Sequence, residues 1–335
     1  MRGPRIKDQN EAFYHIISRV VDRRMVFNTN EKEQIRKTLR RVEGFSGVQV
    51  LTYALLDNHW HLLVRVPAKC DISDDEFLKR MACLYSSSII DTFSRELKSR
   101  RAEGQDDSAE ILKARYTYRM NDLSQFMKTF KQRLSQSFNA RHGRKGTLWE
   151  ERFKSILIQG KPGTLSKVAA YVDLNPVRAG IVKDPKDYRF SGYGEATGGS
   201  QLARAAICRI LSDGSGEWKK LARDYRQLLY TSGEAKGRTN EGKPIRTGFD
   251  QATIDEVLKA KGKLELPELL RCRVRYFTDG LILGSREYVD DVFARHRSNF
   301  SPKRQTGARP MMGGFTDLFT ARRLRLQVIT APAPG

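Results

Sequence analysis

Four short segments of the chain have the composition of β-strands. They are rich in β-branched and aromatic residues and stand between polar, turn-forming stretches, which is the pattern of strands in a sheet. The predicted strands are Ala12–Val21, Val48–Leu56, His59–Val66 and Arg152–Gly160. Only Asp57 and Asn58 separate the second strand from the third, and a two-residue link of this kind indicates a tight hairpin.

Between and after these strands, apolar residues recur at helical spacing. One such helix follows Asn30, the predicted N-cap, and another follows Thr164. A third, Leu123–Gly143, has an apolar stripe on one side and basic residues on the other. Strands and helices in this order predict an α+β fold with an antiparallel-rich, ferredoxin-like sheet covered by helices.

The composition changes near Ser191–Gln201, where small residues indicate a domain boundary. We therefore predict one domain over residues 1–195 and a mainly helical accessory region over residues 201–335. Within that region, residues 266–297 have the pattern of a helix-turn-helix, with Ser285 as the N-cap of its second helix. Such a motif could place Arg286 in a DNA major groove, but a small helical bundle without a DNA role explains the pattern nearly as well.

Charge is the strongest global signal. The 61 Lys and Arg against 39 Asp and Glu give a net charge of +22. An excess of this size indicates a polyanionic partner, above all nucleic acid, because positive potential gathers phosphates and releases their counterions. The basic residues also cluster: Leu123–Trp149 has no acidic residue and contains Lys128, Lys131, Arg133, Arg141, Arg144 and Lys145.

Several other classes of protein fit the sequence poorly. No apolar run reaches the about 18 residues that span a bilayer, and the N-terminal stretch lacks the apolar core of a signal peptide. The four cysteines form no C-x-x-C pair, which argues against a zinc site or a disulfide framework. We expect a soluble, cytoplasmic protein that does not bind membranes.

The third predicted strand contains two of the five histidines, His59 and His61, in the sequence "NHWHLLV". Side chains alternate along a strand, so both imidazoles share one face while Trp60 joins the opposite, apolar face. Two adjacent imidazoles suit a single metal ion. Chance also produces such a pair in roughly 6% of chains with five histidines, so the spacing is only moderately specific.

A set of motifs resembles a known family. The pieces "FYHIISR", "NHWHLLV", "FNARHGRKGTLWEERFKSILI" and "YVDLNPVRAGIVKDPKDYRFSGYG" occur in this order between Ala12 and Gly194. Together they resemble the REP-associated tyrosine transposases, a group of single-tyrosine transposases within the HUH nucleases. The resemblance implies a fold with the two histidines on a central strand and a nucleophilic tyrosine on a later helix.

The resemblance places that tyrosine at Tyr171, just before the Asn-Pro element. Without it, a tyrosine on a helix would be read as a packing residue. Related transposases use an amide side chain near the tyrosine as a third metal ligand, which implies Asn175 beside His59 and His61. Asn175 is shorter than the usual glutamine and precedes Pro176, so a role in ending the helix competes with metal binding.

The implied reaction is metal-dependent cleavage and strand transfer of single-stranded DNA, through a 5′-phosphotyrosine intermediate. The implied cofactor is Mg²⁺ or Mn²⁺, and the implied partner is single-stranded DNA with a hairpin. The basic residues named above, together with Arg152, Lys154, Arg178 and Arg286, are the expected DNA contacts. Such an enzyme would associate with the nucleoid, and the sequence leaves open a homodimer with the tyrosine acting in cis or in trans.

Two other function classes compete with this interpretation. The first is a non-catalytic DNA-binding regulator derived from the transposase fold, which the presence of His59, His61 and Tyr171 disfavours. The second is an RNA-binding module on a ferredoxin-like sheet, which would require exposed aromatic residues where the histidines stand.

Overall fold

A seven-stranded sheet forms the centre of the computed structural model, which describes residues 6–8, 10–212, 216–232, 277–311 and 317–322. The strand order is β2-β3-β1-β4-β5-β7-β6, and all neighbouring pairs are antiparallel except β4 and β5. The strands are β1 (Ala12–Arg19), β2 (Gln49–Leu55), β3 (His59–Val66), β4 (Lys154–Ile158), β5 (Ile282–Gly284), β6 (Arg309–Pro310) and β7 (Phe319–Thr320). The predicted α+β fold and the β2–β3 hairpin are confirmed.

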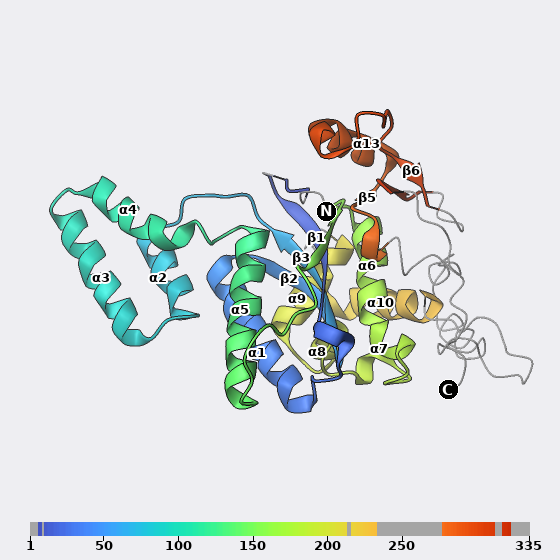
Figure 1. Ribbon diagram of the computed structural model, residues 1–335, viewed down its shortest axis with the longest axis horizontal. Coiled ribbons are helices and arrows are strands. Elements are labelled where there is room, and N and C mark those ends of the chain that lie inside the picture. Colours follow the sequence, from blue (N-terminus) through green and yellow to red (C-terminus); the bar gives the residue numbers. More distant parts are fainter. Residues whose placement is uncertain (1–5, 9, 213–215, 233–276, 312–316, 323–335) are drawn as a thin grey trace, which may run out of the picture.

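Helices cover both faces of the sheet (Figure 1). On the first face, Trp60 and Leu62 of β3 pack with apolar residues of α1 (Thr29–Ser46) and α5 (Leu123–Arg141). On the second face, Leu63 of β3 packs with α6, α9 and α10. These three helices are α6 (Pro162–Asp173), α9 (Gln201–Ser212) and α10 (Trp218–Ser232). Strand alternation therefore sends neighbouring residues of β3 into two separate cores.

Three helices project from the sheet as a separate lobe (Figure 1). They are α2 (Asp74–Ala82), α3 (Ser87–Ala102) and α4 (Asp106–Thr117). Asp74 joins α2 to both other helices, since its carboxylate pairs with Arg101 at 3.0 Å and with Lys113 at 3.0 Å. Residues 103–105 form the turn between α3 and α4.

Two helices begin earlier than the sequence predicts. The N-cap of α1 is Asn28 and not Asn30, because the Asn28 Oδ1 accepts a hydrogen bond from the backbone N–H of Glu31 at 3.0 Å. The helix α6 begins at Pro162 and not after Thr164. Proline suits a first helical turn because the N–H that it lacks would have no partner there.

The described C-terminal residues contribute both strands and a helix. Residues 266–276 of the predicted helix-turn-helix lie outside the described residues. Residues 277–279 are helical, and α13 (Arg286–Arg295) has Ser285 as its N-cap, as predicted. Between them, where the sequence predicts a turn, the apolar Ile282 and Leu283 form β5 and pair with β4. The domain division at residues 195–201 stays a prediction.

Short helices connect α6 to α9. They are α7 (Asn175–Arg178), the 3₁₀ turn η2 (Pro185–Asp187) and α8 (Gly192–Thr197). Two further 3₁₀ turns are η1 (Val21–Arg23), which follows β1, and η3 (Arg297–Asn299), which follows α13.

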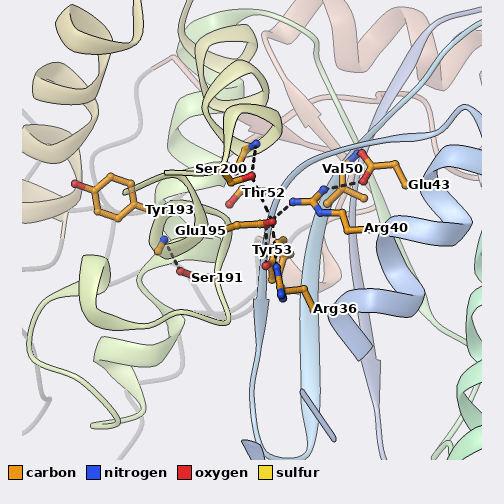
Figure 2. Close-up of polar contacts among 12 residues, drawn as sticks. Arg36, Arg40, Glu43, Val50, Thr52, Tyr53, Ser191, Tyr193, Glu195 and Ser200 are labelled. Carbon is orange, nitrogen blue, oxygen red and sulfur yellow. Dashed lines mark hydrogen bonds and ion pairs between the residues drawn. The ribbon is translucent and has the colours of Figure 1, made fainter. Parts of the chain in front are cut away.

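A polar network joins α8 to the sheet and to α1. Glu195 of α8 accepts a hydrogen bond from Tyr53 of β2 at 2.9 Å and pairs with Arg40 of α1 (Figure 2). Arg40 also pairs with Glu43 at 2.7 Å, and Glu43 accepts from the backbone of Val50 at 2.7 Å. This network holds β2 between α1 and α8.

A buried carboxylate holds α6 against the sheet. Asp173, at the end of α6, has no exposed surface. Its Oδ1 accepts from Thr52 Oγ1 of β2 at 2.7 Å and from the Tyr193 backbone N–H of α8 at 3.2 Å, and its Oδ2 accepts from Tyr225 Oη of α10 at 2.5 Å. Burial raises the pKa of Asp173 to about 6, and the three donors oppose that rise. One side chain thus ties four elements together.

We predict that Tyr225→Phe destabilises the protein, because it leaves Oδ2 of the buried Asp173 without its donor. Loss of one partner of a buried hydrogen bond to a charged group costs about 1–3 kcal/mol. The free energy of unfolding from urea titration measures this loss. The matched control is Tyr118→Phe, which removes the same atom from a side chain that is 56% exposed. Equal stabilities of the two variants would contradict the role of Asp173.

Candidate active site

His59 and His61 lie on the second face of the sheet, as strand alternation predicts. Their ring centroids are 5.3 Å apart. His61 is only 2% exposed, and His59, at the start of β3, is half-buried. Trp60 is fully buried on the first face, where its ring centroid lies 5.2 Å from that of Phe130.

The Nδ1 atom of each histidine has a hydrogen-bond partner. His59 Nδ1 lies 2.6 Å from Oδ1 of Asn58. The Asn58 amide nitrogen donates to the carbonyl of Arg23 at 2.8 Å, so its oxygen faces the ring and accepts from Nδ1. His61 Nδ1 lies 3.0 Å from Nε2 of a third histidine, His15. Among the described residues, neither Nε2 atom of His59 and His61 has a hydrogen-bond partner.

Sequence reasoning missed His15. It lies on β1 beneath the pair, where its residue position is diagonal to that of His61 across the two strands. His15 has no exposed surface, and its Nδ1 lies 2.6 Å from the carbonyl oxygen of Phe277. The available signal was alternation within "FYHIISR", which places the polar ring of His15 on the same strand face as the apolar Phe13 and Ile17.

Burial keeps all three imidazoles neutral at physiological pH. Desolvation, with the positive charge of Arg19, lowers the pKa of His59 to about 4. Desolvation also lowers the pKa of His15 to about 4 and that of His61 well below its usual value. A neutral imidazole with a lone pair is the form that binds a metal ion.

Tyr171 comes from α6 and faces the histidines from above the sheet. Its ring centroid lies 5.7 Å from those of both His15 and His61, in edge-to-face geometry. The ring of Phe277 stacks on it at 5.0 Å, and the guanidinium of Arg178 lies 4.4 Å from its centroid. Tyr171 is 5% exposed. The fold therefore brings together a tyrosine and a histidine pair that are more than a hundred residues apart in sequence.

Asn175 lies one turn beyond Tyr171, at the start of α7. Its Nδ2 donates to the carbonyls of Tyr171 at 3.0 Å and Val172 at 3.1 Å, so the side chain caps the end of α6. This is the helix-ending role that the sequence offered as the competing explanation. Only the amide oxygen of Asn175 is left as a potential metal ligand.

The side chains at this site supply some, but not all, of the ligands that a divalent cation needs. Within the described residues, no three His, Cys, Asp or Glu side chains are grouped so that they could hold a metal ion. His59 and His61 nevertheless present two Nε2 lone pairs on one face, each oriented by a hydrogen bond at Nδ1. An outer partner at Nδ1 is the usual arrangement of histidine ligands. Phosphate and water oxygens would complete the coordination shell.

The helix α5 lies on the face of the sheet opposite to the histidines. Lys128 of this helix is exposed, whereas other basic residues have partners within the protein. Arg141 pairs with Glu31 at 2.6 Å, Lys131 donates to the Glu151 carbonyl at 3.0 Å, and Arg133 donates to the Leu84 carbonyl at 3.4 Å.

The remaining predicted DNA contacts lie on several elements. Lys145 and Arg152 are exposed in the loop between α5 and β4, and Arg144 lies over the Phe138 ring at 5.7 Å. Lys154 pairs with Asp279 at 2.9 Å, and Arg178 donates to the Tyr171 carbonyl at 2.5 Å. Arg286 projects from α13 with 72% of its side chain exposed.

Arg19 is a second residue that sequence reasoning missed. It ends β1 directly opposite His59 and shares the face of His15 by alternation. Among the described residues its guanidinium makes no hydrogen bond or ion pair, and its positive charge acts on both His59 and His61. The loop that contains Lys145 and Arg152 runs past this end of the sheet, where the Glu150 backbone N–H donates to the Arg19 carbonyl at 3.0 Å.

None of the helices in the described part of the chain is long and apolar enough to cross a membrane.

Residues 8–105 match the family model described as "Transposase IS200 like". Among solved structures, a REP-associated tyrosine transposase bound to a REP hairpin is similar at 16% sequence identity. That match covers 61% of this chain and 90% of the other, with a TM-score of 0.36. No curated protein sequence matches the chain.

The family match spans β1, α1 and the β2–β3 hairpin, and therefore includes His15, His59 and His61 but not Tyr171. The resemblance read from the sequence motifs and the match of the N-terminal region agree. The N-terminal part of the chain that contains the three histidines of the site is therefore similar to the IS200-like transposases.

Proposed function

We propose that this protein is a metal-dependent nuclease and strand transferase for single-stranded DNA, with Tyr171 as its nucleophile. The observation that supports the proposal most strongly is the packing of Tyr171 against His61, with their ring centroids 5.7 Å apart. The family match ends before Tyr171, so this contact is independent of it. The contact places the candidate nucleophile beside one of the two candidate metal ligands, as metal-assisted attack on a phosphodiester would need.

In the proposed reaction, the Tyr171 oxygen attacks the scissile phosphorus, and the bond from phosphorus to the 3′ oxygen breaks. The phenol gives up its proton and the departing 3′ oxygen takes one up, which leaves a 5′-phosphotyrosine and a free 3′-OH. Mg²⁺ or Mn²⁺, held by Nε2 of His59 and His61 with the amide oxygen of Asn175 as a third candidate ligand, would polarise the phosphate and offset its developing charge.

The basic residues near the Arg19 end of the sheet are the proposed path of the DNA backbone. Arg19, Lys145 and Arg152 have no partner that competes with a phosphate among the described residues. We assign Arg141 and Lys154 a smaller share of DNA binding than the sequence suggested, because each already pairs with an acidic side chain. A DNA hairpin, which the structural neighbour binds, is the proposed substrate form.

One observation favours a second candidate function, a DNA-binding regulator without catalytic activity. Tyr171 is only 5% exposed, with Phe277 stacked on its ring and the Arg178 guanidinium 4.4 Å from its centroid, so little of the side chain is open to a substrate. The regulator would bind the same DNA but would form no covalent product.

We predict that wild-type protein forms a covalent adduct with hairpin-bearing single-stranded DNA in Mn²⁺, and that Tyr171→Phe forms none, because phenylalanine lacks the nucleophilic oxygen. Labelled DNA that stays with the protein on a denaturing gel measures the adduct. The control Tyr118→Phe removes a hydroxyl from an exposed side chain and should leave the yield unchanged. An equal adduct from Tyr171→Phe would exclude the proposed nucleophile, and wild-type binding without any adduct would support the regulator.

Removal of the metal should abolish the adduct and leave DNA binding largely intact. We predict this for EDTA treatment and for His61→Ala, since both take away the charge that assists attack on the phosphate. Binding is followed by fluorescence anisotropy and the adduct by denaturing gel. His296→Ala, at the end of α13, is the control histidine variant. Full activity of His61→Ala in Mn²⁺ would show that His61 is not a ligand.

The double variant Lys145→Ala/Arg152→Ala should weaken DNA binding. Each lost phosphate contact reduces the slope of log K against log salt by about 0.7 for single strands, so two contacts reduce it by about 1.4. The control, Lys79→Ala/Lys98→Ala, removes the same charge from exposed positions on α2 and α3. If both double variants lose the same affinity, binding depends on net charge and not on the proposed path.

A further inference from the structure

Phe277 contacts two members of the candidate site through different atoms. Its carbonyl oxygen lies 2.6 Å from His15 Nδ1, and its ring stacks on Tyr171 with centroids 5.0 Å apart and an interplanar angle of 18°. Phe277 has no exposed surface. It stands 262 residues after His15 and far beyond the N-terminal region that matches the transposase family.

The carbonyl of Phe277 determines where the protons lie on His15. A carbonyl oxygen can only accept, so Nδ1 of His15 must donate to it. His15 is fully buried, and no acidic side chain among the described residues contacts its ring, so nothing stabilises a second proton on it. Its Nε2 therefore has a lone pair and acts as an acceptor.

The same reasoning extends from His15 to His61. Because Nε2 of His15 accepts, Nδ1 of His61, 3.0 Å away, must donate. A neutral imidazole has one N–H, so Nε2 of His61 is left with the lone pair that a metal ion needs. If His15 donated at both nitrogens instead, His61 would carry its proton on Nε2 and could not bind a metal through that atom.

We propose that the Phe277 backbone carbonyl sets, through His15 as a positioning residue, the tautomer that makes His61 a metal ligand. The ring of Phe277 at the same time fixes the orientation of Tyr171. The chain beyond residue 276 is therefore part of the active site and is not only an accessory region. This inference rests on the proposed function for the metal, but the tautomers themselves are properties of the metal-free protein.

The two ligands differ in how they are oriented. His59 is set by its neighbour Asn58, within the hairpin turn. His61 depends on β1 and on a segment from the far end of the chain. Disruption of the C-terminal contact should therefore affect His61 selectively.

Nitrogen-15 NMR of the metal-free, full-length protein tests the tautomers directly, because the chain has only five histidines. The proposal expects His15, His59 and His61 each to be protonated at Nδ1 alone. His15→Gln should preserve this state of His61, since the amide can donate to the carbonyl and accept from His61. His15→Phe should release His61 to a mixture of tautomers. A wild-type His61 protonated at Nε2 would overturn the proposal.

Metal affinity provides the second measurement, made by calorimetric titration with Mn²⁺ and without DNA. Loss of an outer hydrogen-bond partner typically lowers metal affinity by about 10–100-fold. We expect His15→Phe to show this loss, His15→Gln to bind close to the wild-type level, and the control His296→Phe to bind as wild type. Equal affinity of folded His15→Phe and wild type would overturn the proposal.

Two further outcomes keep this test separate from that of the proposed function. If His15→Phe does not fold, the proposal is tested by the tautomers of the wild-type protein and by the Mn²⁺ affinity of Phe277→Ala. Loss of the Phe277 ring should loosen the position of its carbonyl and so weaken Mn²⁺ binding. If the wild-type protein has the expected tautomers and binds Mn²⁺ but forms no DNA adduct, the positioning role stands and the nuclease assignment fails.

Discussion

A single buried carboxylate determines where the helix with the candidate nucleophile lies. Asp173 ends α6 and accepts hydrogen bonds from β2, α8 and α10, at distances between 2.5 and 3.2 Å. A buried carboxylate is costly unless donors surround it, so these elements can come together only in a way that satisfies it. Tyr171 lies two residues before Asp173, and its position over the histidines follows from that constraint.

The site combines groups of very different sequence separation. The β2–β3 hairpin supplies His59 and His61, β1 supplies His15 and Arg19, α6 supplies Tyr171, and Phe277 follows from the C-terminal part of the chain. His15 and His61 are buried and His59 is half-buried, and the hydrogen bond at Nδ1 of each ring fixes its proton there. This arrangement would orient the proposed ligand pair in the absence of metal, as outer hydrogen bonds do in metal sites in general.

Much of this architecture could be predicted from local patterns. Alternation in "HWHLLVRV" placed the two imidazoles on one face and Trp60 on the other, and β3 has the predicted bounds. The contact between His15 and Phe277 could not be predicted in this way, because it joins residues 262 apart and involves a backbone atom. Likewise, the sequence predicted Arg141 to be a DNA contact, whereas in the structure it pairs with Glu31, which lies 110 residues earlier in the chain. Pairing of distant charges has no periodic signature in sequence.

We propose that a divalent cation binds between the two Nε2 atoms of His59 and His61, on the side of Tyr171. A crystal of the full-length protein grown with Mn²⁺ and measured at an anomalous wavelength locates that ion directly. We expect one strong anomalous peak within coordination distance of both Nε2 atoms, with the Tyr171 ring facing it. A peak at another group of side chains, or none beside the histidine pair at saturating Mn²⁺, would contradict it.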